Sequence, residues 1–413
     1  MSEPFIWERP EGKLNSGASM LGEEEVEEVL AVIKGRALSR DYGPDSRETV
    51  LNFERNIAKK LGAGFALGVT SGTAALKVAL AAAGVGPGHE VIMPCCTFIS
   101  SASATISLGA VPVFAEIDES LGIDPDDIEA RITPHTKAIL PVHLYGVPCQ
   151  IDRVVEIAKK HNLKVIENCA LSCGTKYKDR YIGTWGDLGI YSMQIVKILT
   201  AGEGGVVVSS DAGLYERAVR YHDIGGYREK TRLTGVTGNE DEFIGENFRI
   251  SELTGAVALK QLEKLDRITG SLRANYKRYR EGIESIPGLE LHPVNDPEGA
   301  LATRWGLLFE NAETCATFSN KMRERGLSPG LMYGGNPIYM QPKILNQVMH
   351  TPSANPWTSP IYKGDTRSYH KGLCPRSEDI MNRVLMIASV NPLYSDRDVD
   401  GILDIVRDAA ESL

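Results

Sequence analysis

Apolar positions recur along the first part of the chain at two different spacings. At residues 22–34 and 47–61 they follow one another at intervals typical of amphipathic helices. From about residue 65, short apolar runs alternate with helical stretches. The runs and helices include SGTAALKVALAAAG, EVIMP, TFISSASATISLG, VPVFAEI, PDDIEARI, KAILPVHLYG, IDRVVEIAKKHN and LKVIEN. This alternation predicts an α/β domain with a mainly parallel sheet covered by helices on both faces.

The pattern changes near residue 250. Residues 250–285 predict a long helical connection that leaves the sheet domain. Shorter strand-like pieces, a helix at 313–325, a stretch rich in Pro, Gly and Tyr, and an amphipathic terminal helix follow. A chain of 413 residues is expected to form more than one domain. We divide it into an N-terminal segment (1–20), a large domain (21–265) and a C-terminal domain (266–413).

The composition excludes some classes of protein. The formal net charge is −9, whereas nucleic-acid-binding domains usually present a basic face. The chain begins with MSEPFIWERPEGKLNSG and has no run of about 18 apolar residues, so we expect a cytoplasmic protein without a membrane-spanning segment. The seven cysteines form no CxxC pair and have no histidine at ligand spacing, which favours free thiols over a zinc site.

A strand-to-helix turn in GVTSGTAAL is the first candidate site. The helix starts with Ser71, Gly72 and Thr73, whose backbone N–H groups, hydroxyl groups and helix dipole suit a phosphate. Ser and Thr are also common helix caps, so an ordinary capped helix is the alternative. The neighbouring GAGFALG does not match GxGxxG, and a dinucleotide site is not predicted.

Lys197 is the second candidate. It lies in YSMQIVKILTAGEGGVVV, between two predicted strands, after Ser192 and before a glycine-rich turn. A lone lysine in a loop is usually a solvated surface charge. Here apolar residues at 195–196 and 198–199 flank it, which predicts a lowered pKa and a nucleophilic amine. Such an amine forms Schiff bases with carbonyl compounds.

These two motifs belong to a longer ordered set. Its members are EEVEEVL, GVTSGTAAL, PCCTFISSASA, GAVPVFAEID, PHTKAILPVHLYG, VIENCA, GDLGIYSMQIVKILTAGEGG and GENFRISELTGAVALKQL. As a set they resemble the DegT/DnrJ/EryC1/StrS aminotransferases, which use pyridoxal 5'-phosphate (PLP) on sugars and cyclitols. The resemblance is strong over about residues 15–270 and looser through CPRSEDIMNRVLMI. SMQIVKILTAGEGG is most similar to the branch of inosose aminotransferases and aminohydroxybenzoate synthases.

The resemblance implies the PLP-dependent transferase fold type I. This fold has a large domain with a seven-stranded, mainly parallel sheet flanked by helices and a smaller C-terminal α+β domain. It also implies a homodimer with a shared active site. By position, Lys197 matches the lysine that holds the cofactor covalently and then moves a proton.

Five further positions match cofactor-binding residues of the family. Gly72, Thr73 and Ser192 match residues that bind the phosphate. Phe98 matches an aromatic ring stacked on the pyridine, with a core phenylalanine as the alternative. Asn247 matches an asparagine that reaches the phosphate from the partner subunit, with a turn asparagine as the alternative.

Asn168 departs from the family pattern. Family members end this strand in Glu-Asp, and the Asp pairs with the protonated pyridine nitrogen; this chain has Glu167 and Asn168. Strand alternation places Glu167 on the opposite face, so it does not replace the Asp. A neutral hydrogen bond from Asn168 to the pyridine nitrogen, in place of the charge-assisted bond of the family's Asp, lowers the preference for the protonated ring by about 1–2 kcal/mol. Leu171 stands where the family usually has Gln or His.

Three interpretations of Asn168 follow. Transamination persists with weaker electron withdrawal; or the chemistry has moved to epimerisation, elimination, decarboxylation or reaction with oxygen; or the chain is a non-catalytic sensor or scaffold, against which the retained Lys197 argues. We expect the first, with amino transfer from Gln or Glu onto a keto sugar, cyclitol or related metabolite of antibiotic or polysaccharide biosynthesis. For the substrate pocket we expect Asn15–Met20, Tyr181–Asp187 and Tyr333–Tyr339.

Overall fold

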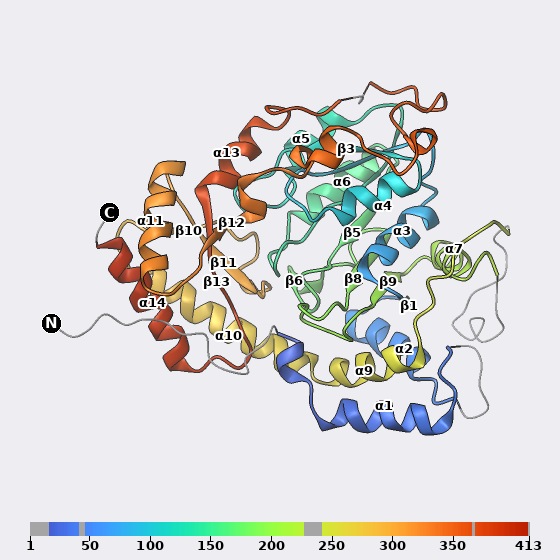
Figure 1. Cartoon of the computed structure of the whole chain (residues 1–413), viewed down its shortest axis with the longest axis horizontal. Coiled ribbons are helices and arrows are strands. Elements are labelled where there is room, and N and C mark those ends of the chain that lie inside the picture. Colours follow the sequence, from blue (N-terminus) through green and yellow to red (C-terminus); the bar gives the residue numbers. More distant parts are fainter. Residues whose placement is uncertain (1–15, 41–45, 227–241, 366–367, 412–413) are drawn as a thin grey trace.

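A seven-stranded sheet forms the centre of the large domain (Figure 1). The computed structural model describes residues 16–40, 46–226, 242–365 and 368–411. The strands lie in the order β1-β9-β8-β5-β4-β2-β3. Their bounds are β1 Phe65–Val69, β2 Glu90–Pro94, β3 Val111–Ala115, β4 Thr136–Ile139, β5 Lys164–Asn168, β8 Leu188–Ser192 and β9 Gly205–Ser209.

Most neighbouring strands of this sheet are parallel. Strand β2 pairs in parallel with β3 and β4, β4 with β5, and β5 with β8. Strand β9 runs antiparallel to both β1 and β8. The predicted mainly parallel α/β sheet is therefore confirmed. The carboxyl ends of the parallel strands share one edge, which is where ligands bind in sheets of this kind.

Helices cover both faces of the sheet. Neighbouring residues of one strand point to opposite faces, and they belong to two separate apolar clusters. On β5, Val165 lies in one cluster and Ile166 in the other. The helices α1, α2 and α9 lie side by side along one edge of the domain (Figure 1). The helices of this domain are α1 Glu23–Gly35, α2 Thr49–Leu61, α3 Gly72–Ala82, α4 Ser100–Ser107, α5 Pro125–Arg131, α6 Ile151–Lys160, α7 Ala212–His222 and α9 Glu252–Glu263.

The predicted helical connection consists of two helices, α9 and α10 (Leu265–Glu284), separated at Lys264. Helix α10 leads to a second, antiparallel sheet in the order β10-β11-β13-β12. Its strands are β10 Glu290–Leu291, β11 Arg304–Leu308, β12 Gly330–Leu331 and β13 Val384–Ser389. The remaining α-helices and strands are the hairpin β6 Lys176–Tyr177 and β7 Arg180–Tyr181, and the helices α11 Ala312–Glu324, α12 Pro342–Leu345, α13 Pro375–Arg383 and α14 Asp396–Ala410. Short 3-10 helices lie at Ala18–Met20, Met332–Gly335, Ile338–Met340 and Pro352–Ala354. The predicted α+β character of the C-terminal part is therefore present.

Residues 332–365 and 368–381 lead from the small sheet back to the large domain and pack against it. Ile338 N–H donates to the carbonyl of Cys95 (2.8 Å), and the Tyr369 hydroxyl donates to the carbonyl of Pro112 (2.7 Å). The buried aromatic residues of this segment share one apolar cluster with α3 and β2. The domain boundary at 265/266 stays a prediction. None of the helices in the described part of the chain has the length and the apolar composition that a membrane-spanning segment needs.

Candidate active site

A cavity of about 1060 Å³ lies at the carboxyl edge of the large sheet. Residues of both the large domain and the small domain line it. Six of the predicted site residues line it: Gly72, Thr73, Phe98, Asn168, Ser192 and Lys197. Segments that are far apart in sequence therefore meet in one place. Asn247 is not among the residues that line this cavity in the described part of the chain.

One end of the cavity is formed by the start of α3. Ser71 caps the helix, and its Oγ accepts the N–H of Ala74 (3.0 Å). The first backbone hydrogen bond of the helix runs from Ala75 N–H to Ser71 O (2.9 Å), so the N–H groups of Gly72 and Thr73 precede the helical ladder. A helix cap and an anion site are therefore compatible here, because the cap uses the serine hydroxyl and leaves the N–H groups of Gly72 and Thr73 outside the helical hydrogen bonds.

The absence of a side chain at Gly72 brings this helix end against Ser192. A Cβ at Gly72 would lie 2.7 Å from Ser192 Cβ, which is too close for two carbon atoms, and 3.0 Å from Ser192 Oγ. A Cβ at Gly205 would likewise lie 2.4 Å from the carbonyl oxygen of Ser71. Glycines at both positions let the helix end and the Ser192 hydroxyl form one small polar cradle, whose donors suit a phosphate.

Lys197 lies in the turn between β8 and β9. The turn is held by backbone hydrogen bonds from Met193 N–H to Gly204 O (2.8 Å) and from Lys197 N–H to Gln194 O (2.9 Å). Burial lowers the pKa of the Lys197 amine, and the nearby Glu203 carboxylate opposes this effect. The predicted direction of the pKa shift is confirmed.

The apolar neighbours of Lys197 differ in burial. Ile198 and Leu199 are buried, whereas Ile195 and Val196 are 39% and 47% exposed. Val196 and Ile198 line the cavity together with Lys197. The N-terminal segment lies against the same turn, because Gly17 N–H donates to Lys197 O (3.0 Å).

Asn168 presents its amide to the cavity in a fixed orientation. Its Oδ1 accepts the N–H of Ala170 (3.1 Å), which identifies this atom as the oxygen. Its Nδ2 donates to Ser101 Oγ (3.1 Å), and the residue is 4% exposed. The second N–H of Nδ2 remains for a group bound in the cavity.

Phe98 and Asn247 differ in how they relate to the cavity. Phe98 lines it and is 59% exposed, so the alternative of an ordinary core phenylalanine is wrong. Asn247 is exposed, and its Oδ1 accepts the N–H of Arg249 (3.2 Å), as in a local turn. Within one subunit Asn247 therefore has a structural contact, and its role toward a partner stays a prediction.

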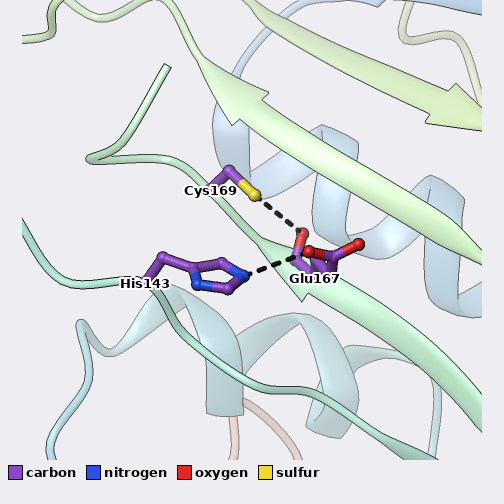
Figure 2. A group of neighbouring side chains, drawn as sticks. All are labelled: His143, Glu167 and Cys169. Carbon is purple, nitrogen blue, oxygen red and sulfur yellow. Dashed lines mark hydrogen bonds and ion pairs between the residues drawn. The ribbon is translucent and has the colours of Figure 1, made fainter. Parts of the chain in front are cut away.

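A cluster of three buried side chains beside the cavity was not predicted from the sequence. Figure 2 shows His143, Glu167 and Cys169, whose possible ligand atoms lie within 4.8 Å of one another. Glu167 Oε1 accepts the N–H groups of Trp185 and Gly186, both at 2.7 Å. To bind a metal, Glu167 Oε1 would have to give up these two hydrogen bonds.

The carboxylate of Glu167 is fully used without a metal. Its Oε2 accepts the N–H of Gly183 (2.7 Å) and contacts His143 Nε2 at 3.2 Å. His143 Nδ1 accepts the N–H of Cys149 (3.2 Å), which places the ring proton on Nε2, where it points to Glu167 (Figure 2). The group is therefore a structural clasp for the loop 183–186.

This clasp corrects one expectation about the pocket. The segment Tyr181–Asp187 does not line the cavity within the described chain, because Glu167 holds it on the other side of β5. Of Asn15–Met20, Ser16 lines the cavity, and Asn15 lies outside the described residues. Of Tyr333–Tyr339, Tyr333 lines it.

The small domain supplies cavity residues that no sequence motif predicts. They are Thr303, Arg304, Gly326, Leu327, Ser328, Ile387, Val390, Asn391 and Tyr394. They come from separate strands and loops, so no local motif contains them.

The comparison with known proteins agrees with this geometry. Residues 19–365 match the model of the DegT/DnrJ/EryC1/StrS aminotransferase family. The chain belongs to this family. It is therefore a PLP-dependent aminotransferase, with the fold type I that the resemblance implied.

Three similar proteins place the chain within the DegT/DnrJ/EryC1/StrS family. The spore coat polysaccharide biosynthesis protein SpsC of Bacillus subtilis (strain 168) is 32% identical over 397 residues, 94% of this chain and 95% of the relative. The L-glutamine:2-deoxy-scyllo-inosose aminotransferase of Streptomyces kanamyceticus is 41% identical over 247 residues, 58% of this chain and 57% of the relative. The crystal structure of DesV from S. venezuelae is similar with a TM-score of 0.81 and 28% sequence identity, and the match covers 99% of this chain and 100% of the DesV chain.

Proposed function

We propose that this aminotransferase moves an amino group from L-Gln or L-Glu onto a keto carbon of a cyclitol or sugar. The observation that carries the proposal is the position of Lys197, with its lowered pKa, in one cavity with five other predicted cofactor-binding residues. The 41% identity to a glutamine:inosose aminotransferase supports a cyclitol acceptor and a glutamine donor.

The residues in the cavity fit PLP. The N–H groups of Gly72 and Thr73 and the hydroxyl of Ser192 form a cradle for the phosphate, and Phe98 presents an exposed ring for the pyridine. Bound PLP supplies an aldehyde that condenses with amines and a ring that withdraws electrons from a neighbouring C–H bond. Lys197 takes up and returns a proton at Nζ, and its lowered pKa raises the share of neutral, basic amine at neutral pH.

The rest of the cavity suits a polar, uncharged acceptor. Hydroxyl and amide side chains other than those of the cradle line it, among them Ser16, Gln194, Ser328 and Asn391. Such groups pair with the hydroxyl groups of a cyclitol or sugar ring.

A second candidate function rests on Asn168. An amide N–H directed at the pyridine nitrogen favours the unprotonated ring, which stabilises a substrate carbanion less. This favours PLP chemistry that tolerates a neutral ring, such as epimerisation, elimination, decarboxylation or reaction with oxygen. A non-catalytic sensor or scaffold has no comparable support, because Lys197 is retained in the cavity.

We propose that the enzyme is a homodimer in which Asn247 of each subunit completes the other subunit's site. Helix α1 supports this with an uncovered apolar stripe: Val26, Leu30 and Ile33 are 57%, 47% and 51% exposed at helical spacing. Asn247 itself is exposed and close in sequence to Ile244, which is 94% exposed. The cytoplasmic location stays a prediction.

The absorbance spectrum tests the enzyme assignment. The purified protein should acquire the visible band of lysine-bound PLP, and borohydride should attach the cofactor irreversibly to the peptide that contains Lys197. Lys197→Ala should lack both signals. A colourless wild-type protein in the presence of excess PLP would contradict the proposal.

Single amino acids separate the two candidate functions. With L-Gln or L-Glu and no acceptor, an aminotransferase loses the visible band and releases one keto acid per site. Oxygen uptake, carbon dioxide release or hydrogen exchange at Cα without loss of the band would instead support the second candidate.

Mixed subunits test the shared site. Lys197→Ala and Asn247→Ala should each be weakly active alone. When they are unfolded together and refolded, the mixed dimers hold one site with both native residues, and activity should return. No recovery in mixed dimers would place Asn247 outside the partner's site.

A further inference from the structure

We propose that Gly17 is a positioning residue for Lys197, and that residues 16–20 (the N-terminal strap) tie the turn that carries this lysine to the small domain. The inference rests on the proposed function and deepens it, because it names the segment that sets the place of the cofactor-binding amine. Gly17 is not among the residues that line the described cavity, so it acts through the backbone of Lys197.

Both peptide groups that flank the Cα of Lys197 are held by hydrogen bonds. The N–H of Lys197 donates to Gln194 O within the turn (2.9 Å). The carbonyl of Lys197 accepts the N–H of Gly17 in the strap (3.0 Å). Since these two peptide groups set the direction in which the side chain leaves the backbone, the strap helps to aim the amine.

Gly17 is required for close approach and not for its backbone angles. Its φ of −67° and ψ of −42° lie in the right-handed helical region that any residue adopts. A Cβ at Gly17, however, would lie 2.7 Å from Ile198 O and 2.9 Å from Lys197 O. Both are backbone oxygens that have no rotamer in which to avoid the new atom. A side chain at position 17 would therefore push the strap away from the lysine turn.

Another contact of the strap reaches the small domain. Asn391, which follows β13 and lines the cavity, donates from Nδ2 to Ser19 Oγ (3.1 Å). Asn391 is itself fixed, because its Oδ1 accepts the N–H of Leu393 (2.9 Å) and its carbonyl accepts Asn275 Nδ2 of α10 (3.0 Å). The strap is thus anchored on an ordered part of the small domain.

The strap also lies at the junction of the two helices that join the domains (Figure 1). Lys264, which separates α9 from α10, donates from Nζ to Met20 O (2.9 Å) and to Glu25 Oε2 (2.7 Å). Met20 is buried in the same apolar cluster as Ile198. A change in the angle between α9 and α10 would therefore reach the lysine turn through the strap.

Gly17→Ala separates the positioning of the amine from damage to the whole site. We expect the rate at which PLP condenses with Lys197, followed by the visible band, to fall about 10- to 100-fold. Pyridoxamine 5'-phosphate has the same ring and phosphate but no aldehyde, so its dissociation constant, measured by calorimetry, should stay within about twofold of the wild-type value. The matched control is Gly86→Ala, where a new Cβ meets nothing within 4 Å.

Two results of this comparison would overturn the proposal. One is an equal rate of condensation in Gly17→Ala and wild type. The other is an equal loss of affinity for PLP and pyridoxamine 5'-phosphate, which would mean that the substitution damages the site as a whole.

Ser19 tests the end of the strap at the small domain, and it does so even where Gly17→Ala fails to fold. Ser19→Ala removes the acceptor of the Asn391 amide, and we expect it to slow condensation about threefold. Ser19→Thr keeps a hydroxyl and should restore the wild-type rate. A wild-type rate in Ser19→Ala would overturn the link between the strap and the small domain.

The reactivity of Lys197 without cofactor distinguishes a failure of this inference from a failure of the proposed function. Trinitrobenzenesulfonate modifies neutral amines, and mass spectrometry of the peptide with Lys197 gives the rate at each pH. Burial lowers the pKa of Lys197, and Gly17→Ala should move the midpoint of this profile back toward 10.5. An unchanged profile would overturn the role of Gly17. A wild-type protein that binds no PLP would refute the proposed function, whereas the profile still decides the role of Gly17.

Discussion

Glu167 and Asn168 are neighbours on β5, yet their side chains leave opposite faces of the sheet. Asn168 faces the cavity, whereas Glu167 is fully buried behind it and accepts the N–H groups of Gly183, Trp185 and Gly186. The carboxylate at 167 is therefore unable to supply the charge that is missing at 168. The two positions have separate roles and separate tests.

Asn168→Asp should strengthen transamination. The Ala170 N–H and the Ser101 hydroxyl both donate to a carboxylate at 168, so the local hydrogen bonds survive. The new charge favours the protonated ring by about 1–2 kcal/mol, and we expect an increase of about 5- to 30-fold in the rate of the half-reaction with L-Glu. Stopped-flow absorbance measures the rate, and Asn168→Ala is the control that supplies neither charge nor amide. A variant that binds PLP normally and gains nothing would show that ring protonation does not limit the reaction.

Lys197→Met should stabilise the protein without cofactor. The pKa of Lys197 is lowered in the folded state, so the unfolded state binds more protons and stability rises with pH up to about 10.5. The variant removes the cost of the buried ammonium, and we expect a gain of about 0.5–2 kcal/mol at pH 7 that shrinks toward pH 10. Urea unfolding at several pH values measures it, with the exposed Lys59→Met as control. A gain that does not change with pH would contradict the assigned cause.

Gly72→Ala should weaken PLP binding about 10-fold or more, because the new methyl group collides with Ser192 and moves the phosphate donors. Titration of the cofactor-free protein with PLP measures the dissociation constant. Gly270→Ala is the matched control, since a Cβ there meets open space on α10, and we expect it to gain about 0.5–1 kcal/mol of stability. Wild-type affinity for PLP in Gly72→Ala would mean that the cradle does not hold the phosphate.

Glu167→Gln should destabilise the fold by about 2–4 kcal/mol despite its similar shape. Each carboxylate oxygen already accepts two bonds, so an amide nitrogen at either position opposes at least one backbone N–H. Denaturant unfolding measures the loss. EDTA should leave the unfolding midpoint of the wild type unchanged. A midpoint that falls with EDTA and recovers with added metal would identify the His143–Glu167–Cys169 group as a metal site.

Leu30→Glu should shift the proposed homodimer toward monomers. The substitution places a charge in the middle of the apolar stripe on α1, between Val26 and Ile33. Sedimentation at several protein concentrations should give a dissociation constant at least about 100-fold higher than that of the wild type. Glu27→Gln, on the exposed part of the same helix, is the control. An unchanged dimer would place the interface elsewhere.

The sequence predicted the parts of the site that depend on local patterns. Gly72, Ser192 and Lys197 lie within continuous motifs at strand ends, and strand alternation correctly separated Glu167 from Asn168. Burial lowers the pKa of Lys197, in the direction that its apolar sequence neighbours predict; Ile198 and Leu199 among these neighbours are buried.

Local sequence patterns do not predict contacts between distant segments. The approach of Arg304 to Tyr145 depends on hydrogen bonds between residues 301–303 and 145–146, and neither segment carries a motif for it. The clasp around Glu167 joins three separate segments in the same way. Hydrogen-bonding and stacking preferences limit which side chains pair only once the fold has brought the segments together.

The return of residues 332–365 and 368–381 to the large domain bears on how the enzyme unfolds. Each of the two apolar clusters contains side chains from both domains, so neither domain would keep an intact interior if the other came apart. Calorimetry of the wild-type chain should then record one cooperative heat-absorption peak. A chain that ends before residue 332 would expose the apolar surface of the large domain that Tyr339 and Trp357 cover.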